Sequence, residues 1–179
     1  AKARQHLRHE EGKISDATKA SINNSVSASS ASGEKRQELL SDARENADKA
    51  AEILLQLHHR LIDDYGRFWR QDLITHQLSA IPEQEIVEAF SILAILNQKP
   101  IPTRTINFQM REPNEYGKIK ASLTVSGQPY VFGLLDCVGE LDRMLHDSLK
   151  NNQKQFLKQI LKKMEEMYTE LERFKEFPN

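Results

Sequence analysis

Glycine and proline, the residues that most often interrupt regular structure, are scarce in the first 99 residues of this chain. Four of the thirteen occur there, namely Gly12, Gly33, Gly66 and Pro82. Within this stretch, residues 35–64 carry apolar side chains at alternating steps of three and four, from Leu40 to Leu61. That spacing places them on one face of a helix. Because such a face must be buried, the chain is constrained to long helices that pack against one another.

The same patterns continue to the end of the chain and predict an all-α antiparallel bundle of about six helices. The expected helices cover residues 3–31, 35–64, 65–78, 82–98, 130–150 and 152–174. In the first, the run SVSASSASG consists of small residues, which permit close helix approach but also suit a frayed arm. Pro82 either begins the fourth helix or kinks a longer one. A length of 179 residues fits a single domain over residues 1–179.

The helical pattern breaks between Pro100 and Pro129, where four of the six prolines and two of the seven glycines lie. Here TINFQM and KIKASLTV alternate apolar with polar residues, which is typical of strands. We therefore expect a long 100–129 connection that carries a small β-ribbon. Loops of this length are uncommon in compact domains unless they serve a function.

Composition excludes several broad classes. No apolar run approaches the roughly 20 residues of a membrane span, and the N-terminal residues lack the apolar centre of a signal peptide. The single cysteine, Cys137, excludes an internal disulfide. These features predict a cytoplasmic protein without membrane partners. A net charge of −1 argues against a globally basic nucleic-acid binder but leaves room for a local basic surface.

Two pairs of carboxylates are the strongest candidates for chemistry. Glu85 and Glu88 are three residues apart, and Asp136 and Glu140 are four apart, so each pair shares a helix face. Converging from neighbouring helices, the four could hold one or two Mg²⁺ or Mn²⁺ ions, which prefer oxygen ligands. Such ions could activate water and stabilise the leaving oxygen of a phosphodiester.

Ordinary solvation is the competing interpretation of the first pair, because E-x-x-E is common on wet helices. The surrounding segment IVEAFSILAIL, however, is apolar nearly all round, so its helix is expected to be buried. A buried, ionised carboxylate needs a partner, a metal or a proton. The setting therefore favours a functional role for Glu85 and Glu88.

The second pair is more equivocal, since Asp136 and Glu140 are expected to point away from the core and could simply be solvated. Gly133 and Gly139 flank their face and would let another backbone come close.

Cys137 lacks an evident base partner in the sequence, which favours a buried structural thiol over a nucleophile. The expected core arc of this helix is Val131, Leu134, Val138, Leu141 and Leu145.

Basic residues offer two candidate contacts for nucleic acid. One is the row Lys150, Lys154 and Lys158 on the last two helices, which could neutralise phosphates. The other is Arg60, Arg67 and Arg70, which cluster around aromatic residues that could stack on bases. Taken singly, each also fits a solvated face or an aromatic core.

The segments that carry the acids resemble the translin superfamily, and within it the translin-associated factor X branch. YVFGLLDCVGELDRM is similar to that branch's G-x-x-D-x-x-G-E-L helix, and QEIVEAFS to its Q-E-x-V-E-A-x-S segment. GKISDATKAS is weakly similar to the first-helix K-x-S-r-D segment. The resemblance implies an octameric homo-oligomeric shell that binds RNA or single-stranded DNA inside.

The same resemblance implies a Mg²⁺-dependent endoribonuclease, with Glu85, Glu88, Asp136 and Glu140 as its catalytic metal ligands. Two alternatives stay open. One is an all-α nucleoside-triphosphate pyrophosphohydrolase of the MazG type, whose acidic helices use Mg²⁺ similarly. The other is a non-catalytic RNA- or single-stranded-DNA-binding assembly protein in which the acids form salt bridges.

Overall fold

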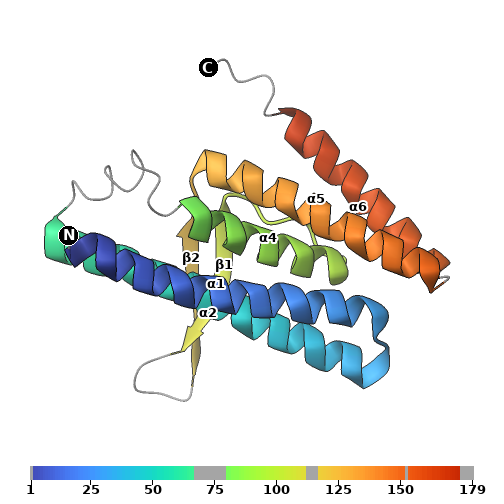
Figure 1. Cartoon of the computed structure of the whole chain (residues 1–179), viewed down its shortest axis with the longest axis horizontal. Helices are drawn as coiled ribbons and strands as arrows, with labels where there is room; N and C mark the ends of the chain where they lie inside the picture. Colours follow the sequence, from blue (N-terminus) through green and yellow to red (C-terminus); the bar gives the residue numbers. More distant parts are fainter. Residues whose placement is uncertain (1, 67–79, 112–116, 152, 174–179) are drawn as a thin grey trace.

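A computed structural model describes residues 2–66, 80–111, 117–151 and 153–173 (Figure 1). These residues form five helices and one two-stranded sheet, so the fold is essentially all-α with the expected β-ribbon. The helix expected over residues 65–78 lies outside the described residues, apart from its first two positions. The elements are α1 (Lys2–Ser30), α2 (Gly33–Tyr65), α4 (Ala80–Leu96), β1 (Thr105–Arg111), β2 (Lys118–Thr124), α5 (Gly127–Lys150) and α6 (Lys154–Arg173).

The first two helices form a long antiparallel hairpin with a very short turn (Figure 1). Small residues line the contact, because Ser21, Ser25 and Ala28 of α1 are buried, as is Ala43 of α2. The Ser21 hydroxyl donates a hydrogen bond to the carbonyl oxygen of Ala43 at 2.7 Å, across the two helices. The small-residue run of α1 therefore serves close packing, and the frayed-arm interpretation is wrong for these positions.

The prediction of antiparallel neighbours is wrong for α4 and α5, which run in the same direction (Figure 1). The backbone N–H of Ser126, just before α5, donates to Glu83 Oε2 near the start of α4 at 2.7 Å. About two turns further along α5, Gly133 lies against Gln84 of α4. The long connection carrying the ribbon returns the chain to the beginning of α4, which makes the parallel arrangement possible.

The ribbon is antiparallel, with Thr105 opposite Thr124 at one end of the register. Its alternating pattern buries one face, and Ile106, Phe108 and Leu123 of that face join the core. The polar residues between them lie on the other face, as alternation in a strand requires.

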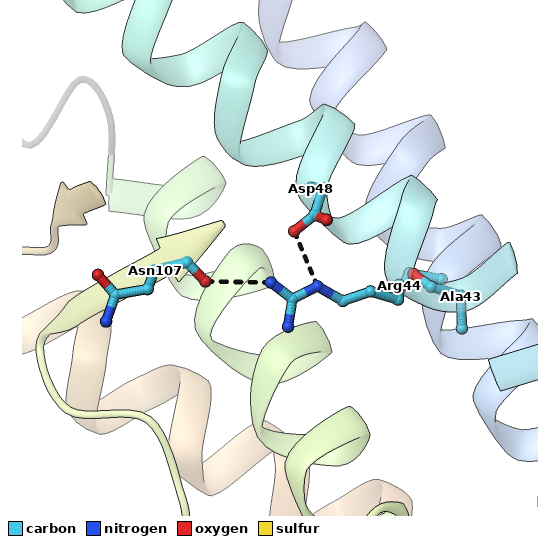
Figure 2. A network of polar contacts seen from close by, with 5 residues as sticks. Ala43, Arg44, Asp48 and Asn107 are labelled. Carbon is cyan, nitrogen blue, oxygen red and sulfur yellow. Dashed lines mark hydrogen bonds and ion pairs between the residues drawn. The ribbon is translucent and has the colours of Figure 1, made fainter. Parts of the chain in front are cut away.

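Two charged residues of α2 fasten the ribbon to the helices (Figure 2). Arg44 donates from Nη2 to the carbonyl oxygen of Asn107 at 3.1 Å and from Nε to Asp48 Oδ1 at 2.9 Å. Asp48 in turn accepts a hydrogen bond from the backbone N–H of Gln109. Because exposed strand edges are open to unwanted pairing, this pair also covers part of the edge of β1.

The core is centred on α4, which contacts α1, α2 and α5. Ile86, Val87 and Ile92 are fully buried, as the apolar character of this segment predicts. Pro82 lies in the first turn of α4, where its missing N–H costs no helical hydrogen bond. No helix in the described part of the chain is long and apolar enough to cross a membrane.

Candidate functional site

Glu85 and Glu88 are presented by α4, a helix whose other residues are mostly buried. Both glutamates are half-buried, so their carboxylates lie between the core and the surface. An isolated charge in that position is unfavourable, and its neighbours decide which form of the carboxyl is stable.

Asp136 and Glu140 reach the same region because α5 comes unusually close to α4 at Gly133. A Cβ atom added at Gly133 would lie 2.5 Å from the carbonyl oxygen of Gln84 and 2.7 Å from Val87 Cβ. Glycine is therefore required at this crossing. By contrast, Gly139 has open space around it, so the expected close approach occurs at Gly133 and not at Gly139.

Polar contacts hold the α5 acids in place. Gln84 of α4 donates from Nε2 to Asp136 Oδ2 at 2.5 Å. Arg143, one turn after Glu140, places Nη2 2.8 Å from Glu140 Oε2. That oxygen is buried and makes no well-aligned hydrogen bond, so it keeps unused acceptor capacity. Gln84 lies within the QEIVEAFS segment, but spacing in the sequence does not indicate its contact with Asp136.

The electrostatics of Glu88 show that the two pairs lie close together. Burial and then the charges of Asp136, Glu140 and Glu85, in that order of effect, together raise the pKa of Glu88 from its usual 4.5 to about 7. Arg143 opposes them by lowering it. Glu85, Glu88, Asp136 and Glu140 thus form one group, called here the acidic cluster. Its role in chemistry stays a prediction.

Cys137 lies beside the acidic cluster and is fully buried, which confirms the expected buried thiol. Burial raises the pKa of this thiol well above its ordinary value, and the negative charges of Glu88, Glu140 and Asp136 add to the effect. The protonated thiol is a poor nucleophile. Cys137 therefore acts as a small core residue of α5.

The core arc expected for α5 is partly wrong. Leu134 and Leu141 are buried as predicted, but Cys137 and Met144 complete the buried face. Because α5 lies between α4 and α6, its buried surface is divided between two neighbours (Figure 1). The second acidic pair is consequently not uniformly solvated, since Glu140 is half-buried while Asp136 is exposed. The expected core residues that are partly buried are Val131, Val138 and Leu145.

Two hydroxyls of α1 also contact the acidic cluster. Ser15 Oγ donates to Glu85 Oε1 at 3.2 Å, and Thr18 Oγ1 lies 2.9 Å from Glu85 Oε2. Both residues belong to the GKISDATKAS segment. Serine and threonine on a helix are too common to indicate such contacts without knowledge of which helix lies opposite.

The donor chemistry of the acidic cluster fits a hard divalent cation. Four carboxylates face one guanidinium, and Mg²⁺ and Mn²⁺ prefer carboxylate oxygens. Besides burial, three neighbouring carboxylates raise the pKa of Glu88, so negative charge is concentrated around this side chain. Among the described residues, no group of three His, Cys, Asp or Glu side chains already converges as ligands. Binding of a divalent cation would thus require rotation of side chains in the acidic cluster.

The basic residues expected to contact nucleic acid do not gather on one surface of the chain. Lys150, Lys154, Lys158 and Arg60 are all exposed. However, the turn between α5 and α6 lies at one end of the molecule, and the C-terminal end of α2 lies at the other (Figure 1). The other two candidates, Arg67 and Arg70, fall outside the described residues.

Comparison with known proteins supports the resemblance to the translin superfamily. The model of the Translin family matches residues 2–177, a range that includes α1 and both acidic pairs. A comparison with curated proteins found no match. Because the family match covers nearly the whole chain, the chain belongs to the translin family.

Proposed function

We propose that the chain is a divalent-metal-dependent endoribonuclease of the translin-associated factor X type. Membership of the translin family implies a nucleic-acid-binding assembly. The observation that carries the enzymatic proposal is the acidic cluster, where burial and the charges of the three other carboxylates raise the pKa of Glu88 to about 7. A binding protein that uses its acids in salt bridges has no need to concentrate them in this way.

In this proposal the four acids hold one or two Mg²⁺ or Mn²⁺ ions, which when bound supply Lewis acidity at a phosphodiester. Without the ion the pKa of the Glu88 carboxyl is about 7, so binding of the ion near neutral pH would displace a proton from it. Gln84 orients Asp136, and Arg143 orients Glu140. These contacts hold the two sides of the cluster while the substrate is bound.

The proposed substrate is RNA, bound within a homo-oligomer that we propose to be an octamer. Asp136 is exposed, as are its neighbours Phe132 and Leu135, so this side of α5 is accessible to a strand. The exposed lysines of α6 would neutralise phosphates. Within one copy of the chain, Arg60 and these lysines lie at opposite ends. A continuous basic path for RNA would therefore have to be completed by basic residues of neighbouring copies.

Cleavage of an RNA oligomer in the presence and absence of Mg²⁺ tests this function. Glu88→Gln and Asp136→Asn are expected to lower the cleavage rate by roughly 10²-fold or more, because they remove charge where it must stabilise the reaction. Both should leave RNA binding unchanged. Glu34→Gln, an exposed position at the start of α2, serves as the matched control and should cleave like the wild type.

Free nucleoside triphosphates should be offered in parallel. Hydrolysis of these nucleotides without RNA cleavage would replace the proposal with a pyrophosphohydrolase. RNA binding without cleavage under any divalent cation would leave a non-catalytic binding protein.

A further inference from the structure

Glu85 differs from the other acids because a third helix holds it. Ser15 Oγ lies 3.2 Å from Oε1 of Glu85, and Thr18 Oγ1 lies 2.9 Å from Oε2. Each carboxylate oxygen therefore has a hydroxyl donor on α1. Ser15 and Thr18 are called here the hydroxyl pair.

The Thr18 hydroxyl has three acceptors within reach and one proton to donate. It lies 3.1 Å from the carbonyl oxygen of Ile14 and 3.0 Å from that of Ser15, besides 2.9 Å from Glu85. Hydrogen bonds to an ionised acceptor are roughly twice as strong as those between neutral groups. Thr18 is fully buried, so water does not compete. The carboxylate of Glu85 is therefore its preferred acceptor.

We propose that Ser15 and Thr18 are positioning residues that set the orientation in which Glu85 binds a divalent cation. This inference rests on the proposed function. An ionised carboxylate offers about four lone-pair positions. The hydroxyl pair occupies two of them, which leaves the others for the cation and orients them.

A freely rotating glutamate would lose conformational entropy on binding the ion, and the hydroxyl pair reduces that loss in advance. Hydrogen bonds to the ligands of a metal commonly contribute 10–100-fold to its affinity. The inference therefore assigns α1 a part in cation binding although it supplies no ligand to the cluster.

The test compares variants of Thr18 in the full chain, with Mn²⁺ affinity measured by electron paramagnetic resonance in the absence of RNA. Thr18→Val keeps the shape and removes the hydroxyl, and we expect it to weaken Mn²⁺ binding by about 10–100-fold. Thr18→Ser keeps the hydroxyl and should bind within a few-fold of the wild type. Ser15→Ala, at a half-buried position, should weaken binding in the same direction and provides a second variant.

Unchanged Mn²⁺ affinity in both Thr18→Val and Ser15→Ala would overturn the inference, and so would an equal loss in Thr18→Ser and Thr18→Val. Mn²⁺ binding that responds as expected in a protein that does not cleave RNA would refute the proposed function and support the inference. A wild-type protein that binds no Mn²⁺ would overturn both.

Discussion

Replacing Gly133 by alanine is expected to push α4 and α5 apart. The added methyl group would lie 2.5 Å from the carbonyl oxygen of Gln84 and 2.7 Å from Val87 Cβ. Carbon atoms in favourable contact are ~3.5–4.0 Å apart. The helices must therefore separate locally by roughly 1 Å, because the obstructing atoms belong to the backbone and to a β-branched side chain.

The energetic effect combines two opposing contributions. Overpacking of this kind costs about 1–3 kcal/mol, whereas alanine is favoured over glycine inside a helix by about 1 kcal/mol. Gly139 lies on the same helix with open space around it, so Gly139→Ala isolates the second contribution. Because helix propensity cancels in the comparison, Gly133→Ala should be less stable than Gly139→Ala by about 1–3 kcal/mol.

Urea denaturation followed by circular dichroism, at one protein concentration for both variants, measures this difference. Separation of the helices also weakens the repulsion that Asp136 and Glu140 exert on Glu88. The pKa of Glu88 should therefore fall from about 7 toward 4.5 in Gly133→Ala, which carbon-detected nuclear magnetic resonance can follow. Equal stability of the two alanine variants would refute the close approach inferred at Gly133.

Three further predictions concern other parts of the molecule. Because the folded pKa of Glu88, about 7, exceeds its usual 4.5, stability should fall as pH rises between these values. Without divalent cations, Glu88→Gln should then be more stable than the wild type at pH 8 but not near pH 4. Urea denaturation of both proteins at the two pH values measures this difference. Arg44→Ala removes the hydrogen bond to Asn107 and should lower the free energy of unfolding by about 1–3 kcal/mol. It should also speed hydrogen exchange in β1, and unaltered exchange there would contradict the anchoring role of Arg44. Lys154→Gln and Lys158→Gln should weaken RNA binding and reduce its salt slope by about 0.7 per lost phosphate contact, whereas an unchanged slope would remove these lysines from the interface.

Much of the fold could be predicted from local sequence patterns. The step of three and four in residues 35–64 corresponds to α2, and the alternation of TINFQM and KIKASLTV corresponds to β1 and β2. These patterns are reliable because the period of a helix or strand follows from backbone geometry, and one buried face imposes it on the sequence.

Helix direction could not be predicted in the same way. A short turn forces α1 and α2 to be antiparallel, whereas the long 97–126 connection allows α5 to start beside the beginning of α4. Nothing in the periodicity of either helix distinguishes a parallel from an antiparallel neighbour. The direction is decided by contacts such as that between Ser126 and Glu83.

The candidate site shows the same division. Spacing by itself places Glu85 with Glu88, and Asp136 with Glu140, because residues three or four apart share a helix face. That the two pairs meet depends on the tertiary structure, in which Gly133 permits contact between the backbones of α4 and α5. The same holds for the support that Thr18 gives to Glu85 across 67 residues of sequence. Local periodicity follows from the geometry of a single helix, but convergence follows from packing between helices, which no single segment encodes.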